Sequence, residues 1–168
     1  GMFIGKGSKS ITEEGLNNSS AQLIPKDGVI ISSRAPIGYI AIAENELTTS
    51  QGCKTFSAYN KIKILSKYIY FVIINSISDL TKRASGTTFK EISGRGVGET
   101  IIPLPPTEEQ QRIVDRINYL MGKIDDYEKV EKELLTLEQK FPDDMKNSLL
   151  QAAMQGKLTE QFDGDSSV

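Results

Sequence analysis

Short apolar runs separated by polar turns fill the first part of the chain. Residues 28–33 (GVIISS) and 37–43 (IGYIAIA) are rich in β-branched side chains and flank Arg34-Ala35-Pro36, which predicts two strands around a turn. Residues 53–58 predict a weaker third strand. These strands and the polar loops between them indicate a small mixed sheet rather than an all-helical fold.

Residues 66–84 carry two conflicting patterns. The run YIYFVII looks like a strand, but apolar side chains recur at steps of three and four from Ile69 to Ala84. We therefore expect a helix, which Ser66 caps and Gly86 ends. The predicted fold class is α+β, a small mixed α/β globule followed by a long helix and a shorter helix.

Three prolines in residues 103–106 mark the boundary between the two halves and are expected to end a sheet edge. Thr107 and Gln110 then match a capping box, and two glutamates suit the first turn of a helix. Apolar residues follow at heptad-like steps of three and four. This predicted helix-pairing seam consists of Ile113, Ile117, Leu120, Ile124, Tyr127, Val130, Leu134, Leu137 and Phe141.

The long helix is expected to end before Pro142, which would start a shorter helix that runs to Gln155 and stops at Gly156. A narrow apolar seam of this length cannot be buried on a small globule, and the shorter helix could cover only part of it. The pattern therefore predicts pairing with a helix of another chain or of a missing part of this one. The expected organisation is a globule at 1–106, helices at 107–160 and a flexible tail at 161–168.

Charge is divided unevenly along the chain. Residues 1–102 hold 12 Lys and Arg against 8 Asp and Glu, whereas residues 103–168 hold 8 against 14, within an overall net charge of −2. The first part suits an anionic partner and the second does not. The longest apolar run, residues 68–74, is too short to span a membrane. We also expect neither an export leader nor an internal disulfide. The cytoplasm is therefore the expected compartment.

The sequence offers little catalytic chemistry. It contains no histidine and one cysteine, Cys53, so neither a histidine general base nor a Cys/His metal cluster is available. The stretch GRGVG at 94–98 lacks the lysine and following helix of a phosphate loop and is interpreted as a flexible connection. Residues 142–146 (PDDMK) are interpreted as helix capping rather than a nuclease site. We therefore expect no enzyme, no metal and no cofactor in this chain.

Basic residues set among small hydroxyl and amide side chains make nucleic-acid binding the more promising function. Lys and Arg neutralise phosphates, while Arg, Gln and Thr also reach base edges. On composition alone, ordinary solvated loops are the favoured interpretation, because a net charge of +4 is modest for a DNA-binding module. The predicted DNA-binding residues are Lys6, Lys9, Arg34, Thr49, Gln51, Lys82, Arg83, Thr87 and Thr88.

The junction IPLPPTEEQQRIVDRI at 102–117, with IDDYEKVEKEL and FPDDMKNSLLQAAMQGKL further on, resembles the DNA-specificity subunit of type I restriction-modification systems. Upstream, residues 11–43, TTSQGCKTF at 48–56 and ASGTTFKEIS at 84–93 resemble its target-recognition domain. The resemblance covers nearly the whole chain, and the junction is its most specific motif.

This resemblance implies a globule that contacts half of a split double-stranded DNA target. It also implies helices that pair antiparallel, set the spacing between two recognition domains and dock methyltransferase subunits. Methylation with S-adenosylmethionine, and ATP-driven translocation and cleavage by the restriction subunit, would belong to those partners.

The family usually has two recognition domains and two helical regions, whereas this sequence has one of each and begins within the recognition domain. It is thus expected to be either a fragment of a longer protein or a half-subunit that pairs with a copy of itself. The alternative function is a helical scaffold or antitoxin-like interaction protein whose globule does not bind DNA. An enzyme ranks third.

Overall fold

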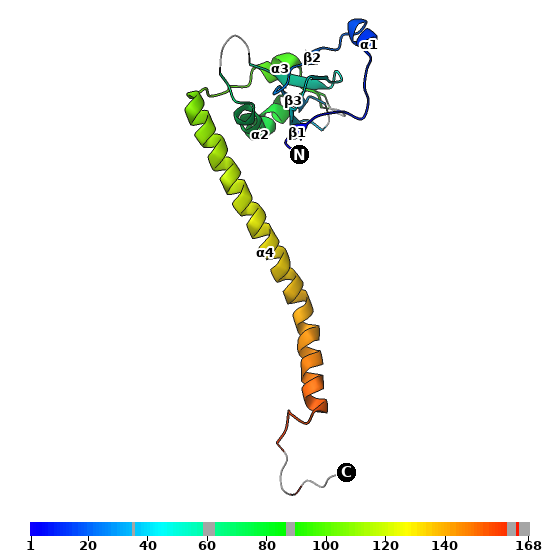
Figure 1. Cartoon of the computed structure of the whole chain (residues 1–168), viewed down its shortest axis with the longest axis vertical. Coiled ribbons are helices and arrows are strands. Elements are labelled where there is room, and N and C mark those ends of the chain that lie inside the picture. The colour runs from blue at the N-terminus through cyan, green and yellow to red at the C-terminus, as the bar shows by residue number, and fades with distance from the viewer. Residues whose placement is uncertain (35, 59–62, 87–89, 161–163, 165–168) are drawn as a thin grey trace. The chain divides into compact units, whose positions relative to one another are not determined.

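A computed structural model describes residues 1–34, 36–58, 63–86, 90–160 and 164 (Figure 1). Within it the chain divides into two compact units, Gly1–Ile117 and Asn118–Val168. The first turns of the long helix thus belong to the first unit, and the boundary between the compact units lies after the junction at 106–107 rather than at it.

The centre of the first unit is a four-stranded sheet with the order β1-β4-β3-β6. Strands β3 and β4 are antiparallel and flank the predicted turn, β6 pairs antiparallel with β3, and β1 pairs parallel with β4. The α+β class and the three predicted strands are confirmed, with somewhat shorter bounds. These bounds are Phe3–Ile4 for β1, Val29–Ser32 for β3, Ile40–Ala43 for β4 and Cys53–Phe56 for β6.

Three smaller elements of this unit were not predicted from the sequence. Strands β2 (Leu23–Ile24) and β5 (Leu47–Thr48) form a separate antiparallel pair. Helix α1 (Glu13–Asn17) is one short turn, which begins where the Thr12 hydroxyl accepts a hydrogen bond from the Gly15 amide. Such short elements carry too few residues to show a period.

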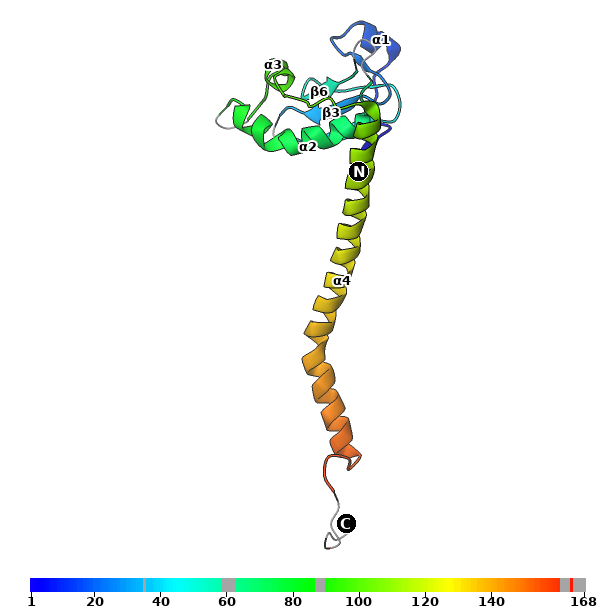
Figure 2. The ribbon, with the colours of Figure 1, turned by 90° about the vertical axis from the view of Figure 1, so that its left-hand side faces the viewer.

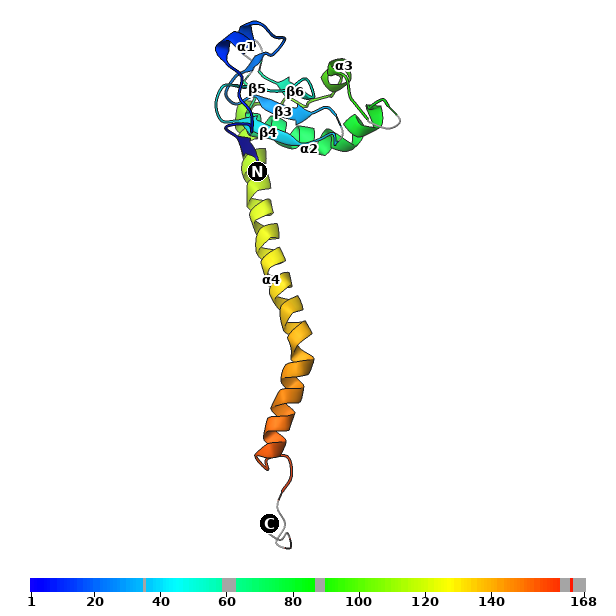
Figure 3. The ribbon, with the colours of Figure 1, turned by 90° about the vertical axis from the view of Figure 1, so that its right-hand side faces the viewer.

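Both faces of β3 are buried, because successive side chains of a strand point to opposite sides of the sheet. Val29 and Ile31 lie in the main core together with residues of helix α2 (Ser66–Arg83), such as Ile73. Ile30 lies in a second cluster on the other face. Helix α2 lies in front of the strands in Figure 2, and the strands lie in front of it in the opposite view of Figure 3.

Helix α2 confirms the helical interpretation of residues 66–84, but Ser66 does not cap it. Leu65 occupies the cap position without a side-chain hydrogen bond. The Ser66 hydroxyl instead donates to the carbonyl of Asp27, at 2.6 Å, and so ties the start of α2 to the loop before β3. The helix ends at Arg83, ahead of Gly86, whose φ of 105° is the left-handed conformation that glycine tolerates.

The prediction of a flexible connection at residues 94–98 is wrong. These residues form a one-turn helix, α3 (Gly94–Gly98), and residues 101–106 contain no strand. The Ser93 hydroxyl accepts a hydrogen bond from the Gly96 amide, and Val97 is buried in the main core. An anchoring valine and a serine cap therefore outweigh the low helix propensity of three glycines.

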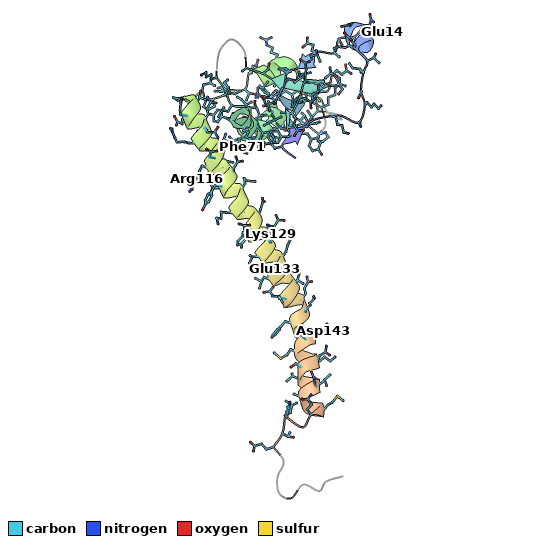
Figure 4. The ribbon with its side chains drawn as sticks, in the orientation of Figure 1. Glu14, Phe71, Arg116, Lys129, Glu133 and Asp143 are labelled. Atoms are coloured by element: carbon cyan, nitrogen blue, oxygen red, sulfur yellow. The ribbon has the colours of Figure 1, made fainter. Side chains whose placement is uncertain are left out.

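The long helix α4 runs without interruption from Thr107 to Met154, 48 residues, so the predicted break at Pro142 and the separate shorter helix are wrong. A proline inside a helix removes one hydrogen bond and crowds the preceding turn, which often bends a helix instead of ending it. The axis of α4 changes direction near Asp143 (Figure 4).

The helix α4 ends as predicted before Gly156, whose φ is 66°. The Gly156 amide donates to the Ala153 carbonyl and the Lys157 amide donates to the Ala152 carbonyl, which is a Schellman arrangement. Within the described parts of the chain, none of the helices combines the length and apolar character needed to cross a membrane.

Gln110 replaces the predicted capping box with a buried clamp. The Pro106 carbonyl accepts the Gln110 amide, so Thr107 already lies inside the helix. The Gln110 side chain is 1% exposed. Its Oε1 accepts the Leu65 amide at 2.9 Å, and its Nε2 donates to the carbonyls of Pro105 at 2.9 Å and Lys63 at 3.3 Å. One side chain thus joins the start of α4 to the segment that enters α2.

Replacing Gln110 with alanine is expected to destabilise the full chain by about 2–3 kcal/mol, because the Leu65 amide loses its partner inside the protein. Chemical denaturation measures this change. The matched control is Gln111→Ala, since Gln111 is exposed and bonds only within its helix, to Asp115. The control is expected to change stability by less than about 0.5 kcal/mol. Equal effects of the two substitutions would show that the clamp contributes little.

Replacing Pro142 with alanine is expected to stabilise the surrounding part of α4 by up to about 3 kcal/mol, since proline is that unfavourable in a helix interior. Circular dichroism of the full chain during thermal unfolding measures the change in helix stability. The control Asp144→Ala should shift it by no more than about 0.7 kcal/mol. An unchanged or lower helix stability in Pro142→Ala would instead indicate a proline at a helix start, where it is favourable.

Candidate nucleic-acid interface

The first unit contains a hollow of about 800 Å³ on the face of the main sheet that does not carry α2. Its floor includes Ile30, Ala41 and Cys53 from β3, β4 and β6. Ile30 and Ala41 are direct partners across the two strands, so the period of two places both on this face. The walls come from residues 4–13 and residues 45–50. We call this cavity the sheet hollow.

Three of the predicted DNA-binding residues line the sheet hollow. Lys6 and Lys9 are exposed on the segment that follows β1, and Thr49 is half-buried after β5. Two carboxylates, Glu13 and Glu46, line it as well. The charge is therefore balanced, and the hollow offers both donors and acceptors rather than a purely cationic phosphate site.

Ser33 joins three segments at the carboxyl end of β3. Its amide donates to the Gly52 carbonyl at 2.8 Å, and its carbonyl accepts the Ile92 amide at 2.9 Å. Arg34 follows directly, and its Nε lies 3.1 Å from the Glu91 Oε1, with the side chains 50% and 45% exposed. Such an exposed ion pair contributes little to stability, so Arg34 remains accessible to a stronger anion.

Gln51 lies beside this junction and is exposed. Its carbonyl accepts a hydrogen bond from the Lys54 ammonium at 3.2 Å. A Cβ atom at Gly52 would lie 3.6 Å from Cδ of Arg34 and 3.8 Å from Oγ of Ser50, so these side chains are neighbours. Because Ser50 also lines the sheet hollow, the Arg34–Gln51 group continues its rim.

Arg83 is held inside the first unit rather than presented to solvent. Its guanidinium is paired with Asp79 at 2.9 Å and also donates to the Gly96 carbonyl and to the Thr100 hydroxyl. These bonds tie the end of α2 to α3. They give the Arg83 guanidinium partners within the protein, so its position is explained without a bound phosphate. The neighbouring Lys82 is exposed. Two further predicted residues, Thr87 and Thr88, lie outside the described residues.

Tyr39 is a residue of this surface that the sequence analysis missed. It is 72% exposed and lines the sheet hollow together with Ala41, two positions further along the chain. The alternation in IGYIAIA would have found it, because Ile40 and Ile42 pack in the main core and Tyr39 must then face the opposite side.

The predicted helix-pairing residues divide between the two units. Ile113 packs against the main core, Ile117 is half-buried, and Val114, which was not predicted, is buried at 1% exposure. The remaining residues are between 44% and 70% exposed, and they are Leu120, Ile124, Tyr127, Val130, Leu134, Leu137 and Phe141. We define these seven as the α4 seam. Figure 4 labels Lys129 and Glu133 on the same part of the helix.

Among the described residues, no group of three or more His, Cys, Asp or Glu side chains is placed to hold a metal ion. The sheet hollow, its Arg34–Gln51 rim and the α4 seam offer hydrogen bonding, charge pairing and apolar contact.

Comparison with known proteins identifies relatives of this architecture. A family model described as the type I restriction modification DNA specificity domain matches residues 2–137. The type I restriction enzyme MjaIX specificity subunit of Methanocaldococcus jannaschii is 37% identical over 130 residues, which are 76% of this chain and 30% of that protein. The EcoR124I/EcoR124II specificity subunit of Escherichia coli is 33% identical over 111 residues, which are 62% of this chain and 27% of that protein.

A solved structure shares the fold. It is titled as the structural basis of complex assembly and conformational transition of the type I R-M system, and it matches with a TM-score of 0.54 at 21% identity, over 81% of this chain and 32% of that chain. The chain thus spans about 30% of the length of the first curated relatives it matches. Since the family model covers most of its residues, this chain belongs to the type I restriction modification DNA specificity domain family.

Proposed function

We propose that this chain is a non-catalytic DNA-recognition part of a type I restriction-modification complex. The observation that carries the proposal is that the family match at 2–137 includes both the sheet hollow and its Arg34–Gln51 rim. Double-stranded DNA is the proposed ligand of this surface. Because the substrate would be cellular DNA, the cytoplasm is the compartment in which this function is exercised.

The surface provides the two kinds of contact that sequence-specific binding needs. Exposed Lys6 and Lys9 of the sheet hollow neutralise phosphates and so position the protein on the duplex, and exposed Lys82, in the last turn of α2, is a further phosphate contact outside the hollow. Arg34 and Gln51 have the donor geometry to read guanine and adenine edges in the major groove. The excess of basic residues in 1–102 favours approach of this half to DNA.

The α4 seam is the proposed docking surface for the other subunits and for a second helical region. Seven large apolar side chains that repeat at heptad-like steps are typical of a helix that packs against another helix. The proposed partners are the methyltransferase subunit, the restriction subunit and a copy of this chain. Methylation with S-adenosylmethionine and ATP-driven cleavage are assigned to those two subunits, so this chain itself requires no cofactor.

Binding of the full chain to duplex DNA is expected to weaken as salt rises. Lys9→Ala and Lys6→Ala should each lower the slope of log K against log salt by about 1 and weaken binding to all sequences alike. Fluorescence anisotropy over a salt series measures both quantities.

The matched control for these lysine variants is Lys129→Ala, whose side chain is exposed on α4 beyond the first unit. Its slope should equal that of the unchanged chain. Duplex binding that is absent, or that ignores salt, would favour a scaffold whose globule does not bind DNA.

Introducing aspartate into the α4 seam is expected to separate the chain from its helical partner. The double variant Ile124→Asp, Leu134→Asp would bury two unpaired carboxylates, which costs about 3 kcal/mol or more and weakens association at least hundredfold. Co-purification with a cognate methyltransferase subunit, followed by light scattering, measures the loss.

The control variant is Lys129→Asp, which places an aspartate on the side of α4 opposite the seam. This variant should still co-purify. If the double variant retains the same partner and the same mass, the α4 seam is not the docking surface.

A further inference from the structure

Tyr39 combines an exposed ring with a fixed backbone. Its side chain is 72% exposed, so burial of the ring contributes little to folding. Its amide donates to the Ser32 hydroxyl at 2.9 Å, and its carbonyl accepts the Ser32 amide at 2.9 Å. Both polar groups of the Tyr39 backbone are thus held by a single residue of the adjacent strand.

The turn before Tyr39 is held equally firmly. The Ser32 hydroxyl donates to the Pro36 carbonyl at 2.8 Å, and the Gly38 amide donates to the Ser32 carbonyl at 3.2 Å. Gly38 has a φ of 104°, and a Cβ atom there would lie 2.8 Å from a methyl carbon of Ile77 in α2. Only glycine fits this position. The turn therefore packs closely against α2, and this packing fixes the position of the Tyr39 backbone.

The sheet hollow that Tyr39 lines has an apolar floor and a polar wall. Ala41 and Ile30 belong to the floor of the sheet hollow, which Tyr39 also lines, while Lys6 and Lys9 belong to its wall. An aromatic ring presents a broad apolar face at a low cost in conformational entropy. In the grooves of duplex DNA, the apolar group on a base edge is the C5-methyl group of thymine, which lies in the major groove.

We propose that Tyr39 is a specificity-determining residue whose ring packs against the methyl group of a thymine in the target sequence. The inference rests on the proposed DNA-recognition function and names one contact of that surface. The lysines of the sheet hollow hold the neighbouring phosphates, and the fixed turn keeps the ring at one position along the groove. The tyrosine hydroxyl is not required for this contact.

Selection of bound sequences from a random duplex pool, using the full chain, first defines the preferred target. Each thymine of that target is then replaced in turn by deoxyuridine, which removes only the methyl group. The unchanged chain should lose about fourfold in affinity at one position, the effect of withdrawing one buried methyl group. Tyr39→Ala should bind the thymine and deoxyuridine duplexes equally at that position, whereas Tyr39→Phe should keep the difference.

The control variant is Tyr119→Ala, which removes a 56% exposed tyrosine from α4 and should keep the full thymine preference. Thermal melting checks that the variants are folded. Continued discrimination by Tyr39→Ala, or its loss in Tyr39→Phe, would overturn the inference while leaving DNA recognition intact. Failure of the unchanged chain to distinguish methylated from unmethylated pyrimidines at any position would overturn it also. Absence of duplex binding by the unchanged chain would overturn both the inference and the proposed function.

Discussion

The backbone of Ser33 is the point on which the proposed DNA surface depends. This residue directly follows the most deeply buried strand of the main sheet, and its two backbone hydrogen bonds fix Gly52 and Ile92 beside it. Three segments that are far apart in the sequence therefore meet at one end of β3. Arg34 and Gln51 are neighbours because of this junction, and the exposed ion pair between Arg34 and Glu91 adds little to it.

Burial on both faces of β3 gives the surface its rigidity. Helix α2 covers the face with Val29 and Ile31, and the smaller cluster around Ile30 forms on the other face. The short second sheet and the segment after β1 cover that face incompletely, which leaves the sheet hollow. Loops mounted on a rigid scaffold can vary in sequence without disturbing the core, and a recognition domain needs this property.

The sequence correctly predicted the elements whose pattern is local. The two β-branched runs, the three-to-four spacing of α2 and the apolar steps of α4 all specify their own secondary structure. It failed where a tertiary contact decides the outcome. Gln110 satisfies the spacing of a capping box but is recruited into a buried clamp, and α3 forms around three glycines because Val97 reaches the core.

The candidate DNA-binding surface was also predictable only in part. Lys6, Lys9 and Thr49 do line one hollow, but nothing local in the sequence shows that Arg83 is occupied by Asp79, Gly96 and Thr100. Tyr39 was available from the alternation of β4 and was missed. Pro142 was expected to end α4, yet the helix continues past it, because one lost hydrogen bond does not outweigh the many that its neighbours keep.

Hydrogen exchange of the full chain, with and without a duplex that carries its selected target, tests the central claim most directly. If the sheet hollow and its rim hold DNA, amides in residues 5–16 and 49–52 will exchange more slowly in the complex, while amides of α4 beyond Asn118 will not change. Protection confined to other parts of the chain, with these two segments unaffected, would contradict the assignment of the DNA surface.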